Sequence, residues 1–168
     1  IDFTLAYPQR VSALVHIAPA ISGAIWPDSL PPDIQALSDE LDEADEADDL
    51  PRINELEAVM WLDGPTSARG RVGGDLRDLF LNMNGIALRM PHLNHEIEPP
   101  SAYERVSDLS LPVLVIWGDL DFPTQKEHSR YLVRSSPSAR GVEIPGTAHL
   151  PNLEQPQIVN ALLHDHLG

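Results

Sequence analysis

LPVLVIWGDLD, residues 111–121, is the stretch that decides the fold of this chain. Residues 113–117 are apolar at every position, and Gly118 ends the run. A strand that is apolar on both faces is typical of a parallel sheet covered by helices on each side. The stretch therefore predicts an α/β fold in which Asp121 lies just beyond the carboxyl end of a buried strand.

A second strand signal leads into EIPGTAHLPNL, residues 143–153. Here the apolar run 142–144 is stopped by Pro145 and Gly146, and His149 follows. Because ligands bind beyond the carboxyl ends of strands in an open parallel sheet, we expect Asp121 and His149 to share one rim. A carboxylate bonded to one imidazole nitrogen leaves the other nitrogen ready to take a proton from a nucleophile.

Each residue of this pair also has a structural interpretation. Asp121 precedes Phe122 and Pro123, and it can simply close an Asx turn. A single histidine in a loop is usually solvated. Asp119 is the alternative acid, since it also follows the strand. The two strand contexts taken together favour a catalytic Asp121–His149 pair.

The segments IWGDLD (116–121) and IPGTAHLPNLEQP (144–156) closely resemble the C-terminal motifs of α/β-hydrolases. The resemblance implies that Asp121 is the acid and His149 the base of a catalytic triad. Residues 7–19 resemble the end of the helix behind the nucleophile and the strand after it. The expected fold is therefore the C-terminal part of an α/β-hydrolase, with parallel strands, flanking helices and an inserted helical cap.

The nucleophile of that family does not occur in this sequence. No serine lies in a G-x-S-x-G pattern, and the resemblance places this elbow about seven residues before Ile1. Residues 1–7 indicate the last turns of a helix that stops at Pro8. We therefore expect a partner in the N-terminal half of the same protein; the alternative is a degenerate, inactive chain.

Residues 22–100 interrupt the strand pattern with helices, so we assign 1–21 and 101–168 to the core and 22–100 to a cap or lid. Helices are predicted from Asp33, over Arg52–Leu62 and over Asp75–Met90, with capping boxes at Ser101/Glu104 and Thr124/Glu127. A lid excludes water and shapes a pocket. The candidate substrate-binding residues are the large apolar side chains Trp26, Met60, Trp61, Phe80, Met83 and Met90.

Three other stretches could carry separate chemistry. The acidic run 39–49 (DELDEADEADD) predicts a solvated helix face rather than a cation site. The Gly- and Arg-rich residues 67–74 lack the pattern of a phosphate-binding loop. His92, His95 and Glu96 do not form an H-E-x-x-H motif, so we expect no metal and no cofactor.

The composition limits the partners. A net charge of −15 argues against nucleic acid, because phosphate binding needs clustered Lys and Arg. No apolar run approaches the roughly 20 residues of a membrane span. The absence of cysteine and of a basic signal-peptide start indicates a cytoplasmic protein.

We expect a hydrolase that uses a serine nucleophile and acts on a small-molecule ester, lactone or related acyl substrate. An Asp nucleophile would instead give an epoxide hydrolase or dehalogenase on the same frame. The alternative is a non-catalytic, hydrolase-like protein that binds a ligand or a partner chain.

Overall fold

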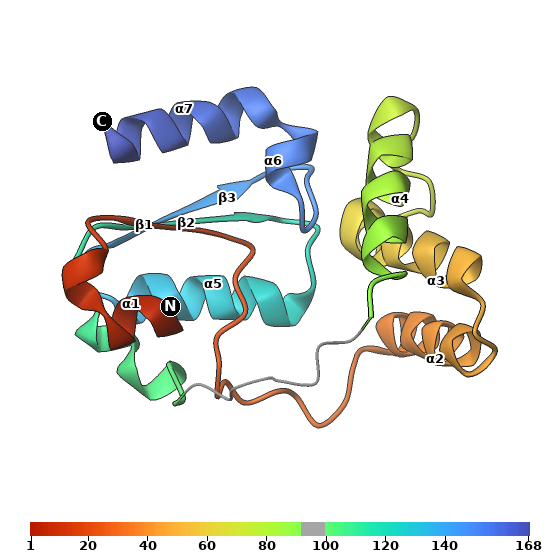
Figure 1. Cartoon of the computed structure of the whole chain (residues 1–168), viewed down its shortest axis with the longest axis horizontal. Helices are drawn as coiled ribbons and strands as arrows, with labels where there is room; N and C mark the ends of the chain where they lie inside the picture. Colours follow the sequence, from red (N-terminus) through yellow and green to blue (C-terminus); the bar gives the residue numbers. More distant parts are fainter. Residues whose placement is uncertain (92–99) are drawn as a thin grey trace. The chain divides into compact units, whose positions relative to one another are not determined.

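The computed structural model describes residues 1–91 and 100–168, and the chain divides into two compact units (Figure 1). The core unit is Ile1–Trp26 with Ile97–Gly168, and the helical unit is Pro27–Glu96. From the sequence we predicted an inserted cap at residues 22–100. Its function as a lid stays a prediction.

A parallel sheet of three strands forms the centre of the core unit. The strands are β1 (Leu14–Ile17), β2 (Val113–Gly118) and β3 (Ala139–Ile144), in the order β1-β2-β3. Both pairs are parallel, with Leu14 opposite Val113 and Val113 opposite Ala139. Every residue of β2 is buried. The predicted fold class is therefore confirmed.

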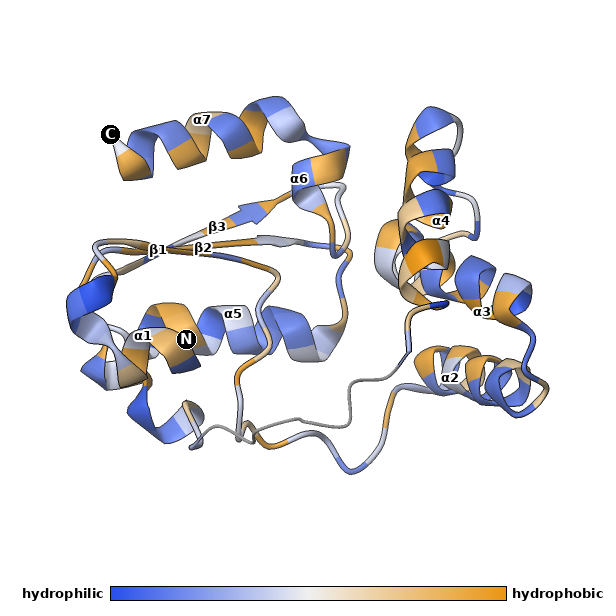
Figure 2. Ribbon diagram, viewed as in Figure 1, coloured by the Kyte–Doolittle hydropathy of each residue, from blue (hydrophilic) through white to orange (hydrophobic). Residues whose placement is uncertain are grey.

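Alternate residues of β2 pack against opposite layers. Val113, Val115 and Trp117 share a hydrophobic cluster with Leu132 of α5 (Pro123–Ser135). Leu114 and Ile116 form a second cluster with Ile144 of β3 and Val159 of α7 (Pro156–Leu167). Figure 1 shows α5 and α7 on opposite sides of the sheet, and Figure 2 shows a largely hydrophobic β2 beside helices of mixed hydropathy. Each such fully buried aliphatic side chain contributes roughly 1.5–3 kcal/mol.

Several predicted boundaries in the core unit were wrong. The strand expected within residues 10–19 is only Leu14–Ile17, because Pro8–Arg10 form a 3₁₀ turn after α1 (Asp2–Ala6). A short helix, α6 (Pro151–Glu154), precedes α7 and was not predicted. Ile158 and Leu167 of α7 are 47% and 61% exposed and do not pack on the sheet.

The two predicted capping boxes do not occur among the described residues. The 3₁₀ helix Tyr103–Asp108 begins after Ala102, and α5 begins after Phe122, each without a side-chain cap. In α5 the first residue is Pro123, whose fixed φ already suits a first turn and which has no N–H to satisfy.

The helical unit consists of α2 (Pro32–Glu46), α3 (Leu50–Glu57), a π-helical turn (Ala58–Asp63) and α4 (Asp75–Ala87). The predicted single helix Arg52–Leu62 is therefore α3 followed by the π turn. The N-cap residues of α2 and α4 are Pro31 and Gly74, so Asp33 and Asp75 are not the caps. Both carboxylates lie in the first turn instead, where the helix dipole still favours them.

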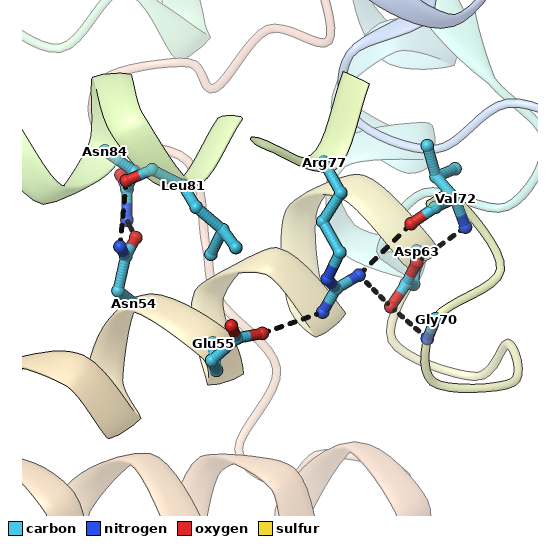
Figure 3. A network of polar contacts seen from close by, with 8 residues as sticks. All are labelled: Asn54, Glu55, Asp63, Gly70, Val72, Arg77, Leu81 and Asn84. Atoms are coloured by element: carbon cyan, nitrogen blue, oxygen red, sulfur yellow. Dashed lines mark hydrogen bonds and ion pairs between the residues drawn. The ribbon is translucent and has the colours of Figure 1, made fainter. Parts of the chain in front are cut away.

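A buried carboxylate organises the loop between the π turn and α4 (Figure 3). Asp63 is fully buried and accepts hydrogen bonds from the backbone N–H groups of Gly70 (2.7 Å) and Val72 (2.9 Å). Arg77 Nη1 donates to the same carboxylate at 3.0 Å and Nη2 donates to Glu55 at 3.2 Å. Burial opposes the charge of Arg77, but these two carboxylates outweigh it and raise the pKa of the guanidinium. The Gly- and Arg-rich stretch is thus wrapped around a structural ion pair.

The chain leaves and re-enters the core unit at a clamped crossing. The carbonyl of Ser22 accepts hydrogen bonds from the N–H groups of Ala102 and Tyr103, both at 3.1 Å. Gly23 has φ +73°, and a Cβ atom built on it would lie 2.0 Å from Ser101 Oγ. Only glycine fits this crossing, which fixes where the inserted segment begins and ends.

Within residues 1–91 and 100–168, no helix has the length and hydrophobicity needed to cross a membrane.

Candidate active site

Asp121 and His149 contact each other at the rim of the sheet. Asp121 follows β2 and His149 follows β3, as the parallel order requires. The imidazole Nδ1 of His149 lies 3.0 Å from Oδ2 and 3.1 Å from Oδ1 of Asp121. The side chain of Asp121 is 0% exposed and that of His149 is 25% exposed. The buried carboxylate of Asp121 therefore contacts an imidazole that is partly exposed at the surface.

The direction of this hydrogen bond fixes the state of the ring. An ionised carboxylate can only accept, so Nδ1 of His149 must carry the proton. The other nitrogen, Nε2, is then the one that can take a proton from a nucleophile. Asp121 Oδ1 also accepts the N–H of the next residue, Phe122, at 2.7 Å. The alternative Asx turn would need the N–H of residue 123, which is a proline and has none.

The end of β2 and the loop that carries His149 lie unusually close together. A Cβ atom on Gly118 would come within 2.1 Å of the carbonyl oxygen of Thr147 and 2.2 Å of that of Ala148. The N–H of Leu120 donates to the Thr147 carbonyl at 3.0 Å. A glycine at this position is what allows the two loops to pack backbone against backbone.

Asp119, the alternative acid, has a different position. Its Oδ1 atom accepts the backbone N–H of Gly146 at 2.7 Å, and its carbonyl accepts from Lys126 Nζ at 2.8 Å. The carboxylate of Asp119 thus binds the backbone of the histidine loop, whereas that of Asp121 binds the imidazole.

The candidate substrate-binding residues differ in exposure. Met60 and Phe80 are only 5% and 8% exposed and belong to the core of the helical unit, and Trp61 is half-buried. Met83 is 58% exposed on α4, and Met90, the additional candidate, is 64% exposed. Burial leaves Met60 and Phe80 little surface for a ligand.

Trp26 is the only one of these candidates assigned to the core unit. It is 55% exposed, and its ring packs edge-on against His128 of α5 at 5.4 Å between centroids. Burial lowers the pKa of His128, whose Nδ1 atom has no hydrogen-bond partner within the described residues. No pattern in the sequence predicts this contact, because Trp26 and His128 are far apart in the chain.

The other stretches give no metal site in the described part of the chain, where no group of three or more His, Cys, Asp and Glu side chains could hold an ion. His92, His95 and Glu96 lie outside the described residues. The acidic run lies mostly on α2 and just after it, and its carboxylates are exposed except for half-buried Glu40, which pairs with Arg69.

No protein-family model matches the sequence. A curated relative, a probable aminopeptidase of Bacillus subtilis, is 26% identical over 93 residues, which are 54% of this chain and 29% of that protein. A thermophilic esterase from Thermogutta terrifontis matches 98% of this chain with 58% of its own, at TM-score 0.65 and 22% identity. A hydrolase from Pseudomonas aeruginosa matches 99% of this chain with 59% of its own, at TM-score 0.68 and 21% identity.

These solved structures are hydrolases of the α/β-hydrolase fold. This chain therefore has that fold, and it corresponds to the C-terminal part of those structures. The chain spans less than two thirds of the length of each of these three proteins.

Proposed function

We propose that this chain is the C-terminal part of a hydrolase that acts on an ester, lactone or related acyl substrate. The observation that carries the proposal is the contact of 3.0 Å between His149 Nδ1 and the buried carboxylate of Asp121. The similarity to a thermophilic esterase supports acyl chemistry, and the similarity to a probable aminopeptidase keeps an amide substrate within the same reaction class.

In the proposed mechanism, His149 moves protons and Asp121 orients it. Nε2 of His149 removes the proton of a serine nucleophile as its oxygen attacks the substrate carbonyl, and the imidazole becomes imidazolium. His149 then returns the proton to the leaving alcohol or amine. The acyl group is then bonded to the serine oxygen; His149 takes a proton from water, which attacks this ester and releases the acid, and the proton returns to the serine. Asp121 stabilises the imidazolium and keeps Nδ1 as the donor throughout.

We propose that the N-terminal part of the same protein supplies the nucleophile and the oxyanion donors. The sequence has no G-x-S-x-G, and the matched esterase and hydrolase are longer than this chain. Within the described residues, β1 pairs only with β2, so its other edge is available to a further strand. The absence of cysteine supports a cytoplasmic location for this protein.

For substrate contact we propose Trp26 of the core unit, which retains exposed surface. In the helical unit, Met83 and Trp61 also retain exposed surface, whereas Met60 and Phe80 support that unit from inside. Apolar walls around a few polar groups are the usual composition of a small-molecule site.

The test uses the whole gene product and p-nitrophenyl butyrate. We expect hydrolysis, labelling by a fluorophosphonate probe that marks a serine nucleophile, and at least about a 10³-fold fall in kcat in His149→Ala. His164→Ala, at the far end of α7, is the matched control and should hydrolyse the ester like the wild type. Hydrolysis that persists in His149→Ala would refute the proposed role.

The second candidate is a hydrolase-like protein that binds a ligand without turning it over. The absence of a nucleophile elbow from the sequence is the observation that favours it. A whole gene product that neither hydrolyses acyl substrates nor reacts with the probe would support this candidate over the first.

A further inference from the structure

Two carboxylates, one before and one after His149 in the sequence, accept hydrogen bonds from the backbone of the loop that carries it. Glu154 Oε1 accepts the backbone N–H of Ala148, the residue directly before His149, at 2.7 Å. On the other side, Asp119 Oδ1 accepts the N–H of Gly146 at 2.7 Å.

Glu154 is well placed to close this loop, because it ends the short helix that follows His149. The helix α6 begins at Pro151, which is buried, and Glu154 is its last residue. The next side chain, Gln155, donates from Nε2 to the carbonyl of Pro145 at 2.9 Å. Residues 145–155 thus form a loop whose end is bonded to its own beginning and middle.

The middle of the loop is fixed from inside the core as well. Thr147 and Ala148 are both 0% exposed, and Thr147 Oγ1 donates to the carbonyl of Ile144 at 2.9 Å. The backbone before His149 is therefore held on one side by buried side chains and on the other by the bond from the Ala148 N–H to Glu154. The position of this backbone sets the position of the His149 Cα atom and therefore of its imidazole.

We infer that Glu154 is a positioning residue for His149, an inference that rests on the proposed function. Glu154 acts on the backbone N–H of Ala148 and sets the place from which the imidazole reaches both Asp121 and the nucleophile. Small misplacements of a catalytic group are costly in rate, because the reacting atoms must meet in one geometry. Asp119 supports the same loop from the strand side.

Two variants of the whole gene product separate reach from charge. Glu154→Gln keeps the length of the side chain and an acceptor oxygen, whereas Glu154→Asp keeps the charge but withdraws the oxygen by one methylene. We expect kcat for p-nitrophenyl butyrate to stay within about twofold of wild type in Glu154→Gln and to fall on the order of tenfold in Glu154→Asp, with KM unchanged. The opposite ranking would show that charge, not position, matters, and would overturn the inference.

A second readout does not depend on turnover. In ¹H NMR spectra, the proton on Nδ1 of His149, which faces Asp121, should give a downfield signal that exchanges slowly with water in wild type and in Glu154→Gln. The signal should weaken or exchange faster in Glu154→Asp. An unchanged signal and an unchanged kcat in Glu154→Asp would overturn the inference even if His149→Ala abolishes hydrolysis. A lost signal in a protein that shows no hydrolysis would instead support positioning while refuting the proposed function.

Discussion

The carboxylate of Asp121 is completely buried, yet it lies 3.0 Å from the Nδ1 atom of a histidine whose side chain is 25% exposed. The imidazole of His149 is the polar group that joins this buried acid to the surface of the core unit. Such a pair is costly to bury unless its hydrogen bonds are made, and both oxygens of Asp121 make one.

Replacing Asp121 with asparagine should remove the charge and keep the shape. We expect kcat to fall by about 10⁴-fold, because the amide no longer stabilises the imidazolium or enforces the tautomer. Steady-state hydrolysis of p-nitrophenyl butyrate by the whole gene product measures this. The control is Asp165→Asn, which loses only an exposed pair with Arg140 and should keep wild-type turnover. Equal turnover in the two variants would exclude Asp121 as the acid.

Replacing Gly118 with alanine should displace the histidine loop. The new Cβ atom would come within 2.1 Å of the Thr147 carbonyl, so the backbone must shift. We expect a loss of roughly 1–3 kcal/mol in the free energy of unfolding, with a loss of activity. Gly73→Ala is the control, since a Cβ atom there meets nothing within 4 Å. Urea unfolding of both variants checks the difference, and equal stabilities would contradict the close approach.

The two carboxylates that pair with Arg77, Asp63 and Glu55, should contribute very differently to the free energy of unfolding. Asp63→Ala leaves a largely buried guanidinium and two backbone N–H groups without their acceptor, and we expect it to cost about 3–5 kcal/mol. Glu55→Ala removes the partner that is 59% exposed and should cost less than about 1 kcal/mol. Chemical unfolding of the two variants measures the contrast. Similar costs would mean that the frame in Figure 3 does not depend on Asp63.

His16 on β1 should make the core unit sensitive to acid. Burial lowers the pKa of His16 from 6.5 to about 4, so the unfolded chain binds the proton more readily. Stability is therefore lost as pH falls from about 6.5 towards 4, by up to about 3 kcal/mol for this group. In His16→Leu, urea unfolding at pH 7 and pH 4.5 should show a smaller loss than in wild type. Identical losses would refute this origin.

The sequence predicted the parts of the fold that depend on local hydrophobic pattern. The apolar run of β2 and the Pro145–Gly146 stop gave the parallel strands, and the order of the strands gave the contact between Asp121 and His149. The roles of these two residues in catalysis stay predictions. Helix starts were less readable, because the N-cap positions of α2, α4 and α5 hold Pro31, Gly74 and Phe122, none of which makes a side-chain cap.

Other features depend on tertiary packing and had no local signal. Phe80 and Met83 lie on the same helix, but only packing decides that the first is buried and the second exposed. Glu154 looked like any surface glutamate, since only the folded loop brings it to the N–H of Ala148. The available signal was the position of Glu154 a few residues after His149, where a carboxylate can accept a hydrogen bond from the backbone of the same loop.

The crossing of Ser22 and Gly23 with residues 101–103 has an evolutionary consequence. Because the chain segments on either side of the insertion meet at this crossing, the residues between them can change in length and composition without altering the strand register or the Asp121–His149 contact. For a hydrolase of the proposed kind, selection for new substrates would then act on a replaceable module, while the proposed proton-transfer residues are kept.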